Sequence, residues 1–199
     1  FNGENKSVTL ADNATIIVAD GTFDTNPISS PKFIVVNSKY NVTYLQSSGG
    51  VKQAGLELKP LYSSGTGSNN RIEMLSIENT NGVNINEVIE VVNLNIKVNS
   101  TISGSGNLKV LKVLSVPTAN ITANFTDGLV TLVSGIIDTA RVNELLENQN
   151  ITGKVNVERS LVNASRRNWR LLTAPVKGNV FNSIYNNWQN NGVSGVGTS

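Results

Sequence analysis

Cysteine and histidine are both absent from the 199 residues of this chain. Their absence excludes disulfides, thiolate or imidazole metal ligands, cysteine nucleophiles and histidine bases. Charged residues are also scarce, at 15% of the sequence, against about a quarter in an average globular protein. The formal net charge of +2 is too small to predict nucleic acid or an anionic membrane as a partner. We therefore expect neither a metal nor another cofactor.

Long apolar runs are absent as well. No run approaches the roughly 20 residues of a membrane span, so no insertion into a membrane is expected. The chain opens with Phe1-Asn2-Gly3 rather than an initiator methionine, and residues 193–199 are rich in glycine and serine. Both ends indicate a piece of a longer polypeptide, whose targeting signal would lie elsewhere.

What the chain does contain is alternation of apolar and polar residues. From Val92 to Val98 every second residue is apolar, with asparagine or lysine between. This period of two is typical of a strand with one buried face. Turn signals such as Asn81-Gly82 and Asp127-Gly128 separate stretches of this kind. The sequence therefore predicts an all-β protein.

Apolar doublets interrupt the alternation at intervals. Val91-Val92, Val110-Leu111 and Leu129-Val130 follow one another at equal steps, and similar doublets stand at Ile16-Ile17, Val35-Val36 and Leu171-Leu172. A strand cannot turn its buried face over without a bend or a bulge, so each doublet predicts a corner. A recurrence of roughly 20 residues is typical of solenoids. We predict a parallel β-helix-like solenoid with turns of roughly 20 residues; the alternative is a β-sandwich.

Four segments follow from composition. We interpret residues 1–46 as the first β repeats, 47–70 as a Gly/Ser-rich loop or excursion, 71–176 as the main solenoid, and 177–199 as a flexible or incompletely closed C-terminal segment. Residues 139–149 differ from their surroundings, because Val142, Leu145 and Leu146 fall at helical spacing. A short helix fits there, and so does a loop that carries the leucines inward.

Acidic residues are the first candidates for chemistry. Glu73 with Glu78, and Glu87 with Glu90, are the nearest carboxylate pairs for cleavage of a glycosidic bond. Each has the parity of a solvent-facing residue, so we favour solvated side chains. Asp12, Asp20 and Asp24 lack the spacing of a calcium loop, and no metal site is expected there.

Basic and aromatic residues gather near the C-terminus: Arg166, Arg167, Trp169, Arg170 and Trp188. One interpretation is a contact surface for a glycan or an anionic polymer, with stacking on the tryptophans. The other is that the tryptophans cover the end of a solenoid core while the arginines stay in water. We favour the second.

The same region carries a family resemblance. Its segments read Val155-Asn-Val-Glu-Arg-Ser, Arg166-Arg-Asn-Trp-Arg-Leu-Leu-Thr-Ala-Pro-Val and Ser183-Ile-Tyr-Asn-Asn-Trp-Gln. Residues 128–192 resemble a recurring part of large secreted proteins of Bacteroidetes-type bacteria, which the type IX secretion system exports. The resemblance implies a β-solenoid repeat region of an adhesin-like cell-surface protein, and it supplies no catalytic residues. Asp138-Thr139-Ala140 matches the short O-glycosylation motif of that bacterial group, which implies a sugar on Thr139.

We therefore expect a non-enzymatic structural or adhesive module of a secreted, extracellular bacterial surface protein. Its partners would be surface glycans or other copies of itself, and the secretion machinery during export. One alternative is a β-helix that binds or cleaves carbohydrate. Another is a subunit that assembles into filaments through open edge strands.

Overall fold

The computed structural model describes residues 7–19, 32–35, 39–46, 48–58, 61–62, 71–135 and 139–158. The chain divides into two compact units, Phe1–Leu161 and Val162–Ser199, and all described residues lie in the first. The described residues are nearly all strand, with one short 3-10 helix, η1 (Leu56–Leu58). Among them no helix is long and apolar enough to cross a membrane. The prediction of an all-β protein is confirmed.

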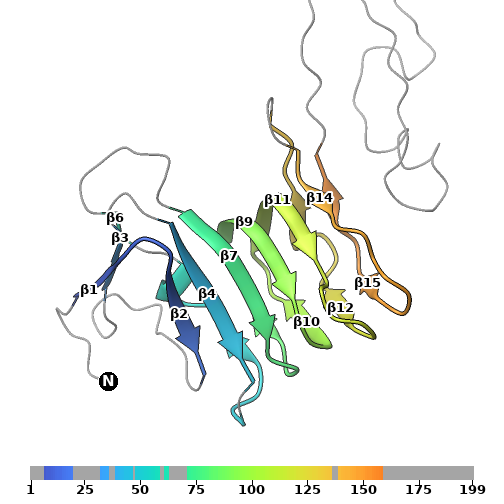
Figure 1. Ribbon diagram of the computed structural model, residues 1–199, viewed down its shortest axis with the longest axis horizontal. Helices are drawn as coiled ribbons and strands as arrows, with labels where there is room; N and C mark the ends of the chain where they lie inside the picture. The colour runs from blue at the N-terminus through green and yellow to red at the C-terminus, as the bar shows by residue number, and fades with distance from the viewer. Residues whose placement is uncertain are drawn as a thin grey trace, which may run out of the picture. The chain divides into compact units, whose positions relative to one another are not determined.

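Most strands belong to two sheets (Figure 1). The long sheet contains, side by side, β2 (Ala14–Val18), β4 (Lys39–Leu45), β7 (Arg71–Glu78), β9 (Val88–Ile96), β11 (Asn107–Ser115), β13 (Val130–Leu132) and β16 (Asn156–Val157), with β14 (Arg141–Val142) also paired to β11. The second sheet contains β5 (Lys52–Gln53), β8 (Val83–Asn84), β10 (Ser100–Ser103), β12 (Thr122–Phe125) and β15 (Asn150–Thr152). A third sheet joins β1 (Ser7–Leu10), β3 (Lys32–Val35) and β6 (Leu61–Tyr62).

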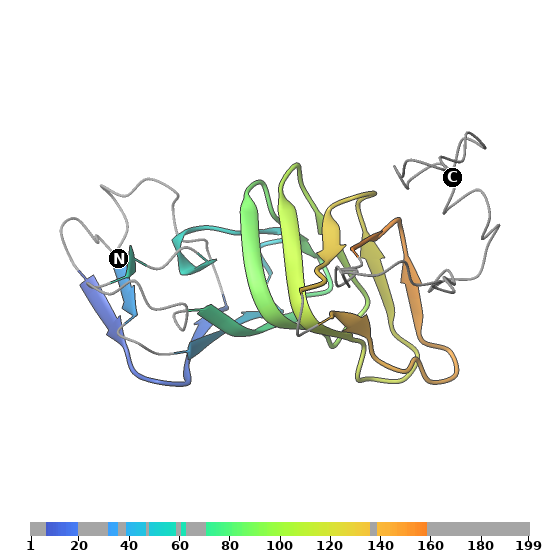
Figure 2. The same ribbon diagram turned by 90° about the horizontal axis from the view of Figure 1, so that it is seen from above.

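The chain alternates between the long sheet and the second sheet (Figure 2). From β7 to β13 each strand in one sheet is followed by a strand in the other. Every pairing between named strands is parallel, and the one isolated bridge in the described part, Ser134 with Thr139, is antiparallel. Parallel neighbours cannot be joined by a tight hairpin. The Asn81-Gly82 turn therefore links strands of different sheets, with Gly82 at φ 93°.

The parallel register stacks apolar side chains into columns. Ile72 pairs with Val91, and Val91 pairs with Val110. We call the number of residues from one position to its partner on the next strand the step, and these two steps are equal. The neighbouring column, Leu75, Leu94 and Leu114, is fully buried. The steps on either side are longer, from Tyr40 to its partner Ile72 and from Val110 to its partner Leu132. Side chains of both sheets contribute to one hydrophobic core.

The predicted corners have mixed outcomes. Between β9 and β11 the register shifts between Val110 and Val113, so the bulge lies at the doublet Val110-Leu111. Val91 and Val92 are both fully buried, as expected where a strand bends. The corner predicted at Ile16-Ile17 is wrong. Alternation continues through β2, where Ile16 is buried and Ile17 is 57% exposed.

Residues 139–149 form neither a helix nor a loop with inward leucines. Arg141 and Val142 extend the ladder beside β11, and the Asn143 amide donates to the Leu114 carbonyl. An extended backbone paired to a strand cannot also be helical. Leu145 and Leu146 point outward, with Leu146 58% exposed. The buried polar group in this stretch is Gln149, whose side-chain amide donates to the Thr118 carbonyl.

The Gly/Ser-rich stretch 47–70 contains structure that packs on the core. β5 pairs with β8 of the second sheet, Lys52 opposite Val83. Helix η1 follows, and its Glu57 and Leu58 are buried. We call residues 50–58 the docked segment, because its Lys52, Glu57 and Leu58 side chains are buried, whereas Val51 and Gln53 are exposed.

Candidate functional site: the polar face of the long sheet

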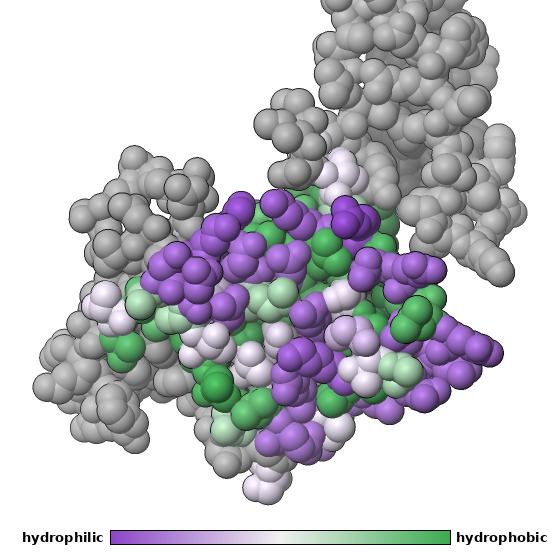
Figure 3. Space-filling view, in the orientation of Figure 1, coloured by the Kyte–Doolittle hydropathy of each residue, from purple (hydrophilic) through white to green (hydrophobic). Residues whose placement is uncertain are grey.

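The outward face of the long sheet presents neutral polar side chains in register. Thr43, Ser76, Asn95 and Ser115 occupy neighbouring positions on β4, β7, β9 and β11; Ser76 is buried and the other three are half-buried. They alternate with the core columns because successive side chains of a strand point to opposite faces. The Ser115 hydroxyl donates to Oδ1 of Asn95, so one strand holds the next. Figure 3 shows hydrophilic and hydrophobic residues interspersed over this face rather than gathered into one apolar patch.

Asparagines repeat one contact along the same face. Nδ2 of Asn93 donates to the Glu73 carbonyl at 3.1 Å, and Nδ2 of Asn41 donates to the Asn13 carbonyl at 3.3 Å. In the first case the acceptor is a main-chain oxygen of the neighbouring strand β7, and in the second it is a main-chain oxygen of the turn that precedes β2. Half-buried amides used in this way stabilise the stack while leaving the surface uncharged.

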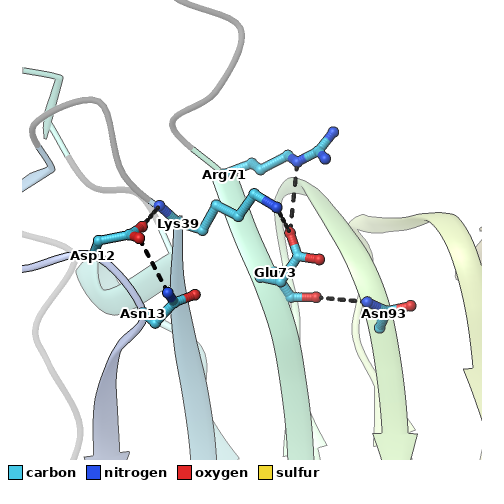
Figure 4. Close-up of polar contacts among 6 residues, drawn as sticks. All are labelled: Asp12, Asn13, Lys39, Arg71, Glu73 and Asn93. Carbon is cyan, nitrogen blue, oxygen red and sulfur yellow. Dashed lines mark hydrogen bonds and ion pairs between the residues drawn. The ribbon is translucent and has the colours of Figure 1, made fainter.

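Ion pairs also join neighbouring strands. Nζ of Lys97 lies 2.7 Å from Oε1 of Glu78, and Nζ of Lys109 lies 3.6 Å from Oε1 of Glu90. Oε2 of Glu73 has Lys39 Nζ at 3.5 Å and Arg71 Nε at 3.8 Å (Figure 4). Exposed pairs of this kind each contribute at most about 1 kcal/mol. Each of the three glutamates thus lies beside a cation that balances its charge.

The carboxylate candidates therefore have structural partners. Glu73 and Glu90 each pair with a lysine of an adjacent strand, Glu78 pairs with Lys97 directly after β9, and Glu87 is exposed. Asp12 accepts hydrogen bonds from the Lys39 backbone amide and the Asn13 side chain, which holds the turn before β2. Asp20 and Asp24 lie outside the described residues. Within the described part of the chain, no group of acidic residues is arranged to hold a metal ion.

The other candidates are mostly beyond the described residues. Arg166, Arg167, Trp169, Arg170 and Trp188 all lie there, so their contact with a glycan or polymer stays a prediction. Thr139 is described and exposed, in the connection between β13 and β14. Its hydroxyl oxygen lies 3.0 Å from the Ser134 hydroxyl oxygen. Glycosylation of Thr139 also stays a prediction.

One buried carboxyl group, that of Glu57, was not predicted from the sequence. Glu57 of η1 is fully buried, and its Oε1 accepts hydrogen bonds from the Tyr44 hydroxyl and from the Gly55 amide at 2.9 Å. Burial raises the pKa of Glu57, and the hydrogen bonds from Tyr44 and Gly55 lower it by less. Burial is also the main reason why the pKa of Tyr44 is well above its ordinary value. Sequence offered no signal, because the partners lie on different elements.

Comparison with protein-family models, with curated proteins and with solved structures found no match. The chemistry of this face therefore has to be inferred from its own residues. It offers amide and hydroxyl groups at regular intervals along the sheet, interrupted by neutralised ion pairs. Such a surface can donate and accept hydrogen bonds with a neutral polar partner.

Proposed function

We propose that the chain is a β-solenoid module with a structural or adhesive role in a secreted bacterial cell-surface protein. In this proposal one coil is the chain from a position in the long sheet to its partner on the next strand. The observation that carries the proposal is the parallel register, in which Ile72, Val91 and Val110 follow one another at equal steps. Coils of this kind build a continuous core by repetition, without disulfides or metals.

The connections also support coiling. Parallel strands need crossover connections, which in most proteins are helices. Here the crossovers run through β8, β10 and β12 of the second sheet, and the described residues contain no α-helix. A β-sandwich is built from antiparallel strands, so parallel pairing counts against that alternative.

The polar face supports a structural or adhesive role. Its acidic groups are paired with lysines, and its amides hold neighbouring strands together. We propose surface glycans or further copies of the chain as partners, and the secretion machinery as a transient partner during export. The extracellular location rests on the resemblance of residues 128–192 to exported adhesin-like proteins.

Deletion of one coil tests the architecture. Removing Glu78–Ile96 takes out one whole coil and lets Ile77 occupy the position of Ile96, while β5 pairs with β10 in place of β8. A solenoid predicts a shorter protein with β-type circular dichroism and a cooperative unfolding transition. The matched control removes Glu78–Glu87, about half a coil, and should unfold because the register is lost. Equal loss of structure in both variants would contradict stacked coils.

A binding experiment tests the role. The protein is applied to a glycan array and to immobilised cells, and the bound glycans are then assayed for released reducing ends. The proposal predicts adhesion without release. Release that is lost in Glu73→Gln or Glu78→Gln would instead establish the carbohydrate-cleaving alternative. Growth of particle size with concentration in light scattering, without glycan binding, would favour the filament alternative.

Two variants locate the contact if binding is found. Asn93→Ala changes the polar face, and Trp169→Ala changes the C-terminal cluster of arginines and tryptophans. Loss of binding in Asn93→Ala, while the variant still unfolds cooperatively and is folded under the binding conditions, would assign the contact to the long sheet. The same result for Trp169→Ala would assign it to that cluster.

A further inference from the structure

The docked segment, residues 50–58, brings an acidic group into the core without a matching cation. Glu57 is fully buried, and no ion pair joins it to a cation of the described residues. Its Oε1 has two donors, the Tyr44 hydroxyl and the Gly55 amide. Its Oε2 is buried with no hydrogen-bond partner among the described residues. The two oxygens of one carboxyl group thus have unequal surroundings.

A neutral carboxyl group fits these surroundings better than a carboxylate. Oε1 then acts as the carbonyl oxygen that accepts both hydrogen bonds, and the proton resides on Oε2. An ionised group would leave part of a negative charge on Oε2, which has neither a hydrogen-bond donor nor an ion-pair partner among the described residues. Burying an unpaired charge costs far more than burying an unpaired hydroxyl.

Among the described residues, few titratable groups lie near Glu57. Tyr40 and Tyr44 of β4 face Glu57, and the Tyr40 hydroxyl donates to the Glu57 carbonyl at 3.2 Å. Both tyrosines are fully buried. Lys52 of β5 is 2% exposed, but it makes no ion pair with Glu57. β3, which lies next to η1, begins with Lys32.

We propose that the docked segment is a pH-controlled latch, held in the core by the protonated form of Glu57 and loosened when that carboxyl group ionises. The released state would expose the docked segment while the regular coils of residues 71–115 stay folded. This proposal does not depend on the adhesive role, because it concerns the segment's own docking.

The direction in which docking depends on pH follows from the difference in proton affinity between the docked and the released state. Burial raises the pKa of Glu57 above its ordinary value of about 4.5, so the docked state binds the proton more tightly than the released state. The stabilisation from docking is complete below the ordinary pKa and is lost as the pH rises through the raised pKa. Between these two pKa values the docking equilibrium changes by about tenfold per pH unit, the slope for one proton.

Amide hydrogen exchange of the full chain tests the latch. The reporters are Lys52 and Ala54, whose amides donate to the carbonyls of Gly82 and Asn84. The matched controls are Lys97 and Asn107, whose amides donate to the carbonyls of Ile77 and Glu87 in the regular coils. Protection factors, corrected for intrinsic exchange, are measured from about pH 4 to about pH 9. We expect the protection factors of the reporter amides to fall by up to about tenfold for each unit of rising pH, while those of the control amides stay constant.

Two variants separate the latch from general destabilisation. Glu57→Gln keeps an acceptor for Tyr44 and Gly55 but cannot ionise, so protection of the reporters should become independent of pH. Tyr44→Phe removes a hydrogen bond that lowers the pKa of docked Glu57, so the loss of protection should begin at the same pH but continue to higher pH.

Protection factors of Lys52 and Ala54 that do not change with pH in the wild-type chain would overturn the proposal. Protection that rises with pH would also overturn it, because a paired carboxylate would then hold the segment. An unchanged pH profile in Glu57→Gln would assign the titration to another group. If Glu57→Gln does not dock at any pH, the wild-type profile and the wider pH range of the loss in Tyr44→Phe decide the matter.

Discussion

Residues 71–115 and residues 39–62 contribute to the same long sheet but fill the interior differently. In the first region the step between paired positions is short, as from Ile72 to Val91, and aliphatic side chains meet aliphatic side chains. In the second the step is considerably longer, from Tyr40 to Ile72. The additional residues include the docked segment, which adds Lys52 and Glu57 to the interior.

The length of the step determines which kinds of side chain the region buries. A short step contains little more than strands and turns, so it buries mainly the aliphatic columns, together with the polar side chains of Ser76, Asn79 and Ser100. A longer step has residues to spare, and these either leave the scaffold or enter the core with polar groups that need partners. Stability in the short steps should depend on packing, whereas in the long step it should depend on hydrogen bonds and pH.

The largest expected effect is in the regular region. Leu94→Ala removes a fully buried side chain between Leu75 and Leu114, and should lower the free energy of unfolding by about 2–5 kcal/mol. The control, Ile17→Ala on the edge strand β2, changes a 57% exposed side chain and should stay within about 0.5 kcal/mol. Urea denaturation measures both. Equally small decreases in the free energy of unfolding for both variants would mean that the buried apolar columns do not stabilise the sheet.

A pair of glycines sharpens the comparison at the turns. Gly82 and Gly128 have φ values of 93° and 78°, but a Cβ on Gly82 would lie 2.3 Å from the Thr101 carbonyl oxygen, whereas on Gly128 the nearest atom is at 3.9 Å. Gly128→Ala should cost about 1–2 kcal/mol for the backbone alone. Gly82→Ala should cost about 1–3 kcal/mol more, because the backbone of β10 at Thr101 must move. Similar midpoints in urea would show that the turns are not stacked closely.

Asn79 connects the two regions. This fully buried side chain donates to the carbonyls of Gly50 and Gly82, and the main-chain carbonyl of Asn79 accepts from the Ser100 hydroxyl. Asn79→Ala should cost about 1–3 kcal/mol, because two buried carbonyls lose a donor. Half-buried Asn93 donates to one carbonyl, so Asn93→Ala should cost about 1 kcal/mol or less. Thermal unfolding compares them, and the reverse order would contradict the stated role of Asn79.

The smallest effect concerns the surface ion pairs. A double-mutant cycle of Glu78→Gln and Lys97→Gln should give a coupling of about 0.2–1 kcal/mol, because both side chains are partly exposed. The coupling should shrink as salt is added. A coupling well above this range would mean that ion pairs, rather than columns, determine the stability of the regular region.

Local patterns predicted the regular region well. The alternation from Val92 to Val98 indicated β9, and the doublet Val110-Leu111 indicated its neighbour's bulge. The regular step also explains the ion pairs, because it places Lys97 beside Glu78 and Lys109 beside Glu90. A repeating structure turns a distance in sequence into a contact in space, so period and parity carry most of the information.

Patterns failed where a contact depends on elements of different kinds. The leucines that flank Glu57 do not indicate that its carboxyl group accepts a hydrogen bond from Tyr44, because no repeat relates η1 to β4. Leu145 and Leu146 have helical spacing, but β14 pairs with β11 and leaves them outside. The C-terminal arginines and tryptophans lie outside the described residues, so that prediction awaits its test.

The most direct test of the stacked register uses the absence of native cysteine. Ser76 and Asn95 are paired on neighbouring strands, and Asn95 pairs in turn with Ser115. Neighbouring strands lie about 4.8 Å apart, within the range of a disulfide, and strands two apart lie about 10 Å apart, beyond it. The account predicts that Ser76→Cys with Asn95→Cys forms an intramolecular disulfide on oxidation, and that Ser76→Cys with Ser115→Cys does not. Equal cross-linking of both pairs, or of the second alone, would contradict it.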